Sequence, residues 1–332
     1  MLPDSRPPVE TYDLVMLDLD GVVYVGPDAV PGAADHLAQA RDAGVRLAFV
    51  TNNASRPPDV VADRLTGLGV PADPTDVVTS AQASARLVLD EHGEGARVLL
   101  LGGAGLEAAA REAGLVPVGL DDDPVVLMTG YGPDVLWSDV MAAAVAVEQG
   151  LAWVASNTDH TIPTARGRAP GHGVLVDMLA RYTGVDPIVA GKPQPPLLHE
   201  TVRRVGGERP LMVGDRVDTD IEGAHAVDVD SLLVLTGVTG LAELAAIAAE
   251  HRPTLLAPDL GGLHEAHEAP QRGDDGWAAD GWTATVADGA LAVTGDGGSV
   301  AAWWRAAACA LWEHLDDGGT PADVDGAVPP AE

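Results

Sequence analysis

The stretch DLVMLDLDG, residues 13–21, decides the fold. After the first acid, the apolar run at residues 14–17 is typical of a strand buried on both faces in a parallel sheet. Two acids and a glycine surround its carboxyl end, which is where open α/β sheets bind ligands. RLAFVTNN, residues 46–53, repeats the pattern after residues 31–44, whose apolar spacing predicts a helix ended by Gly44.

The same alternation continues along most of the chain. Apolar runs predict further strands at residues 97–103, 124–130, 152–157, 187–192, 210–215 and 231–237. Helical spacing predicts helices between them, at residues 80–93, 105–115, 137–150 and 173–182. Strand and helix in turn predict an α/β protein with a Rossmann-like parallel sheet and right-handed crossovers.

The middle of the chain is expected to form a domain of its own. Residues 80–188 contain several predicted strands and helices, so they are too long and too regular for a loop. We expect them to form an inserted α/β cap on a core made of residues 1–79 and 189–264. Closure of such a cap would exclude water and select the substrate.

The C-terminal region differs in composition. Five of the seven tryptophans lie from Trp277 onward. Residues 282–294 read as a β-hairpin around Ala-Asp-Gly, and residues 299–315 as a helix capped by Ser299. A hairpin and a helix are too small to fold alone, so this extension, residues 265–318, should pack on the main body or on another subunit of a homodimer. Residues 319–332 are expected to be disordered.

Composition excludes some functions. A formal net charge of −31 disfavours nucleic acid and anionic membranes as partners, although adaptation to high salt would explain the charge equally well. No apolar run approaches the roughly 20 residues of a membrane helix, and the N-terminus lacks the pattern of a signal peptide. With Cys309 as the single cysteine, no internal disulfide is possible. We therefore expect a soluble, cytoplasmic protein.

The rarest polar residues stand at the ends of predicted strands. Eighteen of the nineteen Lys and Arg residues are arginine, and Lys192 is the only lysine. The only asparagines are Asn52, Asn53 and Asn157. A compact ammonium group at Lys192 is therefore expected to serve a purpose for which arginine is unsuited.

Four strand-end motifs carry the candidate chemistry. The pattern Asp-x-Asp is weak alone, because this acidic chain repeats it by accident elsewhere. In order along the chain, however, strands end in Asp18-x-Asp20-Gly21, Thr51-Asn52-Asn53, Gly191-Lys192-Pro193 and Gly214-Asp215 through Asp220. Carboxyl ends of parallel strands share one edge of a sheet, so these side chains are expected to meet there.

These motifs resemble those of the haloacid dehalogenase (HAD) superfamily of phosphatases. The blocks LDLDGVVYVG, FVTNNASRP, VASNTDHTIPTARG, AGKPQPPLL and MVGDRVDTDIEGA are most similar to the subfamily of 4-nitrophenylphosphatase-like, NagD-like, and phosphoglycolate or glycerol-3-phosphate phosphatases. The resemblance runs from about residue 12 to about residue 245 and leaves out the tryptophan-rich region. It implies a HAD core, an inserted cap and Mg²⁺ as cofactor.

Chemistry and resemblance together predict the roles of the site residues. Asp18 would attack phosphorus, and Asp20 would serve as general acid and base. Converging carboxylates need a cation, so Mg²⁺ is expected on the Asp18 and Asp215 side chains and, as the resemblance implies, on the Asp20 carbonyl. The other expected residues are Lys192, Thr51, Asn52 and Gly21 for phosphate, Asp220 for orienting Lys192 or a metal-bound water, and Asn157, Asp159, Arg166 and Arg168 in the cap for substrate choice.

The substrate is expected to be a small phosphate monoester. Resemblance favours glycerol 3-phosphate or 2-phosphoglycolate, with nucleoside monophosphates, sugar phosphates and pyridoxal phosphate as alternatives. Two hypotheses of other kinds are a non-catalytic module that binds phosphorylated metabolites and an acetyltransferase-like activity of the C-terminal extension. Intact acids beside a candidate nucleophile argue against the first, and the lack of a glycine-rich loop that opens a helix argues against the second.

Overall fold

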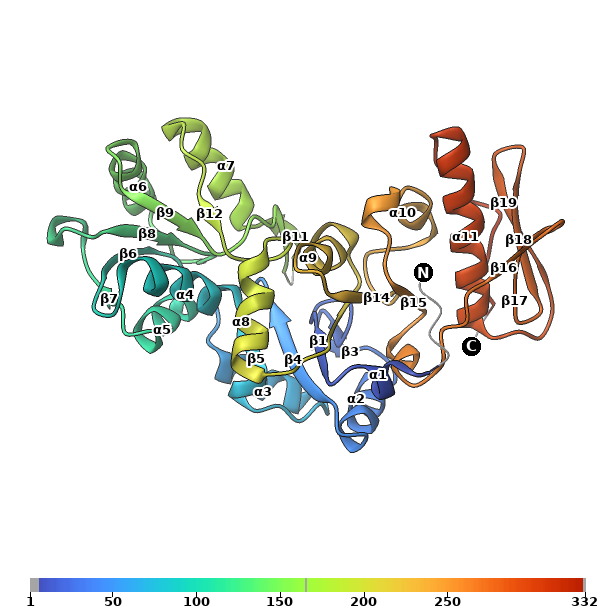
Figure 1. Cartoon of the computed structure of the whole chain (residues 1–332). Coiled ribbons are helices and arrows are strands. Elements are labelled where there is room, and N and C mark those ends of the chain that lie inside the picture. The colour runs from blue at the N-terminus through green and yellow to red at the C-terminus, as the bar shows by residue number, and fades with distance from the viewer. Residues whose placement is uncertain (1–5, 165, 331–332) are drawn as a thin grey trace. The chain divides into compact units, whose positions relative to one another are not determined.

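The computed structural model describes residues 6–164 and 166–330. Within these ranges the chain forms two compact units (Figure 1). The first contains the residues up to Leu47 and those from Gly207 onward, and the second contains Ala48–Gly206. Helices and strands alternate in both, which confirms the predicted α/β class. No helix in the described ranges is both long and apolar enough to cross a membrane.

The first unit is built on parallel strands in the order β15-β14-β13-β1. The four residues of β1 are completely buried, as the apolar run predicts. In the register of β1 with β13, Leu17 lies opposite Val213. The residues that follow these two strands therefore lie side by side at the carboxyl edge of the sheet. The strands are β1 (Leu14–Leu17), β13 (Pro210–Gly214), β14 (Asp230–Val234) and β15 (Leu255–Ala257).

Short helices and turns connect these strands. The helix predicted before Gly44 is confirmed as α2 (Ala33–Asp42), which buries Leu37 and Ala40. The other elements of this unit before residue 264 are α1 (Pro8–Thr11), β2 (Tyr24–Val25), β3 (Asp28–Ala29), η3 (Val217–Ile221), α9 (Glu222–Ala226), α10 (Leu241–Ala245), η4 (Ala249–His251) and η5 (Leu260–Leu263).

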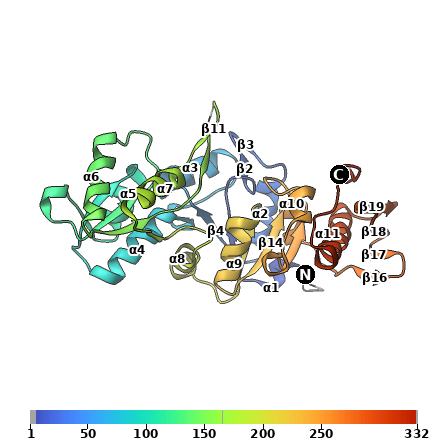
Figure 2. The same cartoon turned by 90° about the horizontal axis from the view of Figure 1, so that it is seen from above.

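The C-terminal extension packs on the core of the first unit. Helix α11 (Val300–Gly318) lies along a four-stranded antiparallel sheet (Figure 1, Figure 2), and Ser299 caps it as predicted. Trp303 and Leu311 share one apolar cluster with Leu233 and Leu256 of the parallel strands. The predicted hairpin is confirmed as the last two strands of a sheet made of β16 (Gln271–Gly273), β17 (Gly276–Ala279), β18 (Trp282–Ala287) and β19 (Ala290–Gly295).

Residues 322–324, within the segment predicted to be disordered, contact the extension, and the last two residues of that segment lie outside the described residues. Asp323 donates its backbone N–H to Gly289 O at 2.7 Å and accepts that of Leu291 at 2.8 Å. Ala322 is buried, and Val324 packs against the same apolar cluster as α11. The composition of this segment is polar, but its few apolar residues find a surface that the extension provides.

The second unit contains a five-stranded parallel sheet in the order β12-β9-β8-β6-β7. Its strands are β6 (Arg97–Leu101), β7 (Val116–Pro117), β8 (Val126–Thr129), β9 (Ala152–Ala155) and β12 (Ile188–Val189). Strand β4 (Arg46–Thr51) begins in the first unit and ends in the second, where it pairs in parallel with β5 (Val77–Thr79). An antiparallel hairpin is formed by β10 (Thr161–Thr164) and β11 (Gly167–Pro170).

Helices cover both faces of this sheet (Figure 1). Helices α4 and α5 form one apolar cluster with it, and α6 and α7 form another. The helices and turns of the unit are α3 (Pro58–Gly67), η1 (Pro74–Asp76), α4 (Ser80–His92), α5 (Ala104–Glu112), η2 (Leu120–Asp122), α6 (Trp137–Glu148), α7 (His172–Thr183) and α8 (Pro195–Val205). Every strand predicted from an apolar run is confirmed, whereas short strands such as β5 and β15 were missed. The predicted domain bounds at residues 79/80 and 188/189 stay predictions; both lie inside the second unit.

The packing of the extension predicts a large stability effect at Trp303, which is 2% exposed. We expect Trp303→Ala to lower the free energy of unfolding by about 3–5 kcal/mol, because it opens a cavity in the apolar cluster. Trp137, which is 63% exposed, is the matched control, and Trp137→Ala should cost no more than about 0.5 kcal/mol. Urea unfolding followed by circular dichroism measures both. An equal loss of unfolding free energy in the Trp303 and Trp137 variants would mean that the packing of Trp303 contributes nothing specific to the core.

A buried histidine lies in the second unit. His172 is 3% exposed, and its Nε2 lies 3.1 Å from Thr129 Oγ1, which also accepts the Trp153 indole N–H at 3.0 Å. Burial lowers the pKa of His172 to about 4, because a charged imidazolium would lose its hydration there. In the unfolded chain the group has its ordinary pKa of 6.5.

This difference predicts acid sensitivity. Below pH 6.5 the unfolded chain takes up a proton that the folded chain resists until about pH 4, so stability falls as the pH falls through that window. The slope attributable to His172 should reach at most about 1.4 kcal/mol per pH unit. We expect His172→Gln to flatten the pH dependence of the unfolding free energy between these values. The exposed His225, changed to Gln, is the control, and an equal flattening there would contradict this role of burial.

Candidate active site

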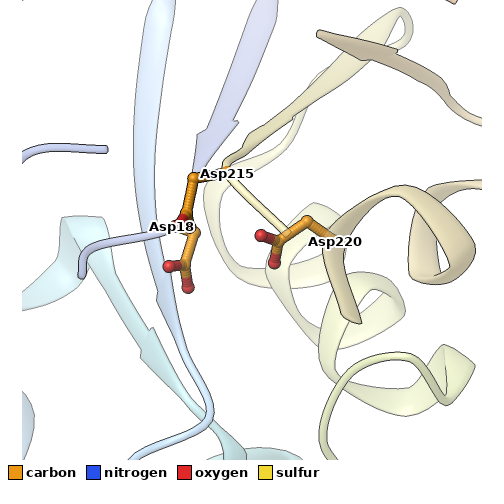
Figure 3. A group of neighbouring side chains, drawn as sticks. All are labelled: Asp18, Asp215 and Asp220. Carbon is orange, nitrogen blue, oxygen red and sulfur yellow. The ribbon is translucent and has the colours of Figure 1, made fainter. Parts of the chain in front are cut away.

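Three carboxylates meet at the carboxyl edge of the parallel strands. Oxygen atoms of Asp18, Asp215 and Asp220 all lie within 4.8 Å of one another, and Figure 3 shows the three side chains around a common space. Asp18 follows β1 and donates its backbone N–H to Val213 O at 2.9 Å, and Asp215 follows β13. Register between two neighbouring strands therefore brings together acids that lie almost 200 positions apart in sequence.

Asp215 is held by the loop that follows β14. It is completely buried, and its Oδ2 accepts the backbone N–H of Val238 at 2.6 Å. Thr239 Oγ1 donates to Asp215 O at 2.6 Å. A Cβ atom at Gly21 or Gly237 would overlap the Asp215 carboxylate. The sequence predicted residues 231–237 only as a strand; its Thr-Gly end, like the polar ends of the other strands, was the signal that this loop reaches the site.

Asp220 reaches the same point from a single π-helical turn, η3, a feature often found at functional sites. Its Oδ2 accepts the backbone N–H of Arg216 at 3.1 Å, and Gly214 leaves room for the side chain. Asp218, two residues earlier, instead forms a bidentate ion pair with the Arg216 guanidinium. The turn therefore brings Asp220 to the other two acids and directs Asp218 toward Arg216.

Gly21 lies in a tight turn that follows Asp20. Its φ of +93° requires glycine, but its N–H is donated to Tyr24 O at 2.8 Å. The N–H groups of Val22 and Val23 are donated to Leu19 O. These three donors bond within the turn, and the predicted role of Gly21 in phosphate binding stays a prediction. Asp20, which lies between Leu19 and Gly21, is exposed.

The three carboxylates suit a divalent cation. Mg²⁺ prefers carboxylate oxygens and keeps several waters, and the mutual repulsion of three acids this close is relieved by a positive ion. Asp18 and Asp215 fit as direct ligands, and the predicted contribution of the Asp20 carbonyl stays a prediction. Asp220 fits either as a ligand or as an acceptor for a metal-bound water. The donor set therefore agrees with the predicted cofactor.

The remaining predicted residues belong to the second unit. Lys192 is 2% exposed, which is rare for a lysine. Asn52 bonds to the Lys192 backbone and to Asp159, and Asn157 donates to Asn52 O at 2.6 Å. Thr51 Oγ1 accepts the backbone N–H of Asn53 at 3.1 Å, so its own hydroxyl proton is free to be donated elsewhere. Five predicted residues, Thr51, Asn52, Asn157, Asp159 and Lys192, thus lie in one region of this unit.

The other two predicted cap residues lie apart from that network. Arg166 and Arg168 are exposed on the β10–β11 hairpin, and Arg166 donates its backbone N–H to Thr164 Oγ1 at 3.3 Å. Their predicted contact with substrate stays a prediction.

A parallel α/β sheet with a carboxylate-lined cation site at its strand ends defines the class as a metal-dependent α/β enzyme. Comparisons with known proteins are more specific. A family model for haloacid dehalogenase-like hydrolases matches residues 15–116, and a HAD-hydrolase-like model matches residues 189–263. D-glycerol 3-phosphate phosphatase of Mycobacterium tuberculosis is 41% identical over 92% of this chain and 87% of its own length. An acid sugar phosphatase of Staphylococcus saprophyticus is 35% identical over 71% and 91%.

Solved structures agree with these relatives. The crystal structure of glycerol phosphate phosphatase from M. tuberculosis in complex with magnesium matches with a TM-score of 0.84 and 40% identity, over 96% of this chain and 94% of that one. The crystal structure of a double mutant of a thermostable NPPase from Geobacillus stearothermophilus matches with a TM-score of 0.69 and 31% identity, over 75% of this chain and 96% of that one. The chain belongs to the haloacid dehalogenase-like hydrolases and is a phosphoric monoester hydrolase, which confirms the predicted family and class.

Crowding around Asp215 predicts a metal-binding defect. The φ of Gly237 is not in the left-handed region, so Gly237→Ala acts by pushing the Asp215 carboxylate out of place. We expect the affinity for Mg²⁺, measured by calorimetric titration, to fall by about 10-fold to 100-fold. Gly67→Ala is the control, since a Cβ there meets no atom within 4 Å. Unchanged Mg²⁺ binding in the Gly237 variant would show that Asp215 is not a ligand.

Proposed function

We propose that the protein hydrolyses a small phosphate monoester, D-glycerol 3-phosphate in the first place, with Mg²⁺ and through a phosphorylated Asp18. The observation that carries this proposal is the convergence of Asp18, Asp215 and Asp220 within 4.8 Å at one sheet edge. A binding module needs no carboxylate nucleophile beside a cation site. Catalysis is therefore favoured over the non-catalytic alternative.

In the first step, Asp18 Oδ attacks phosphorus in line, the bond to the alkoxide oxygen breaks, and Asp20 gives the leaving oxygen its proton. In the second step, Asp20 takes a proton from water, which attacks the same phosphorus and releases inorganic phosphate from Asp18. The exposure of Asp20 suits a group that must reach both the leaving oxygen and water. Asp18 ends unchanged, as a catalyst must.

The phosphoryl group carries negative charge throughout, so cations and donors do most of the remaining work. Bound Mg²⁺, held by Asp18 and Asp215, would neutralise the charge of the phosphoryl oxygens and of the acids. We assign the ammonium group of Lys192 to the same oxygens, with the hydroxyl proton of Thr51 as a further donor. Asp220 would orient Lys192 or a metal-bound water.

Resemblance over 92% of the chain supports the choice of substrate. The predicted core and cap together, residues 1–264, make up 264 of the 332 residues, which is less than the 92% of the chain that the M. tuberculosis phosphatase matches. The match therefore has to include part of the C-terminal extension. The acid sugar phosphatase matches over 71% only, which makes a sugar phosphate the second candidate.

The extension finds its packing surface on the first unit itself, so it does not require a partner subunit. The homodimer and the cytoplasmic location stay predictions.

Phosphate release tests this function. With Mg²⁺ the protein should release inorganic phosphate from D-glycerol 3-phosphate faster than from 2-phosphoglycolate, sugar phosphates, nucleoside monophosphates or pyridoxal phosphate. Asp18→Asn should lower kcat by about 10³-fold or more, because the amide is a poor nucleophile. The control is Asp218→Asn, whose parent carboxylate pairs with Arg216. Wild-type turnover by Asp18→Asn would refute the mechanism, and preference for another ester would refute the substrate alone.

A further inference from the structure

The backbone of Lys192 is buried at a point where the strand has ended. Strand β12 stops at Val189, and the last ladder bond is donated by Ala190 to Ala155 O at 2.9 Å. Lys192 itself is 2% exposed, so water cannot satisfy its peptide N–H and C=O groups. They need protein partners if the lysine is to keep one position.

Asn52 supplies both partners. Its Oδ1 accepts the Lys192 backbone N–H at 2.8 Å, and its Nδ2 donates to the Lys192 carbonyl oxygen at 3.0 Å. The side-chain amide thus takes the place of a neighbouring strand. Gly191 makes this approach possible, because a Cβ there would lie 2.6 Å from Asn52 Oδ1.

The second hydrogen of the same amide is also used. Asn52 Nδ2 donates to Asp159 Oδ1 at 3.2 Å. An amide nitrogen has two hydrogens, and here one bonds to the Lys192 carbonyl and the other to Asp159. No donor of the Asn52 side chain is left for a phosphate oxygen, so the predicted phosphate contact at Asn52 would have to come from backbone amides.

The backbone of Asn52, directly after strand β4, is itself held in place. Its backbone carbonyl accepts hydrogen bonds from Ser80 Oγ and Asn157 Nδ2, both at 2.6 Å. Asn157 Oδ1 also accepts the backbone N–H of Asp159 at 3.1 Å. Asn52 therefore joins Lys192 to the segment 157–159 through hydrogen bonds that are buried at Lys192 and Asn157 and partly buried at Asp159. Buried hydrogen bonds are costly to break.

We propose that Asn52 is a positioning residue that sets the place of Lys192 and ties it to residues 157–159, rather than a phosphate ligand. The proposal rests on the role assigned to Lys192 in the proposed function. Aspartate at this position would lack both donors, and glutamine would be one methylene too long for the two bonds to Lys192. Asparagine is the side chain whose shape copies a peptide group.

A double-mutant cycle on inorganic phosphate binding tests this role. The probe is phosphate with Mg²⁺, titrated by calorimetry into the parent protein, Asn52→Ala, Lys192→Met and the double variant. Asn52→Ala alone should weaken phosphate binding by about 10-fold, since displaced lysine loses charge-assisted bonds. In the Lys192→Met background the same change should cost less than about 2-fold. Thr201→Ala is the control, because that buried hydroxyl donates to Leu197 O within helix α8, outside the strand-end motifs.

The outcomes separate the two roles. An equal loss in both backgrounds would make Asn52 a direct ligand and overturn the proposal, as would no loss with Lys192 present. If Lys192→Met leaves phosphate binding unchanged, the assigned role of Lys192 fails together with this inference. Failure of D-glycerol 3-phosphate as substrate would leave the binding result intact. If Asn52→Ala does not fold, Asn52→Leu replaces it in the double-mutant cycle, because leucine keeps the shape of the side chain without its hydrogen bonds.

Discussion

Repulsion between three acids is the constraint on which the rest of the structure depends. Asp18, Asp215 and Asp220 approach within 4.8 Å, where each pair of like charges repels by about 3 kcal/mol at an effective dielectric constant of about 20. Two of the three are completely buried. A bound cation would relieve this repulsion. The backbone N–H groups of Val238 and Arg216 hold the carboxylate oxygens of Asp215 and Asp220 in place. The strands and loops serve to maintain an arrangement that the acids themselves oppose.

Glycine residues make close polar packing possible in both units, around the three acids in the first and around Asn52 in the second. Gly21 and Gly237 leave room for the Asp215 carboxylate, Gly214 for Asp220, and Gly191 for Asn52. In each case the backbone approaches a polar side chain more closely than a Cβ atom would allow. Such contacts fix the position of charged groups before a substrate arrives, and preorganised charge is the main means by which enzymes stabilise a phosphoryl-transfer transition state.

The C-terminal extension belongs to the stability of the catalytic unit. Trp303 and Leu311 share a cluster with Leu233, which lies in β14, directly before the loop that holds Asp215. The extension therefore supports the strand from which that loop starts. This packing accounts for the tryptophans of the segment, so no separate activity is needed to explain them. It is also consistent with the match to the M. tuberculosis phosphatase, which continues into the same region.

The sequence by itself determined the strands and the residues at their ends, because apolar periodicity and Asp-Gly or Thr-Asn endings are local signals. It therefore predicted Asp18, Asp215, Asp220 and the buried lysine. Only the tertiary structure decided how polar groups pair across long separations. Val238 was missed because its N–H meets a carboxylate 23 residues away, and the bonds of Asn52 to a backbone 140 residues away were missed because they leave no trace in composition or spacing. Hydrogen-bond partners are chosen by proximity in space, which the fold alone creates.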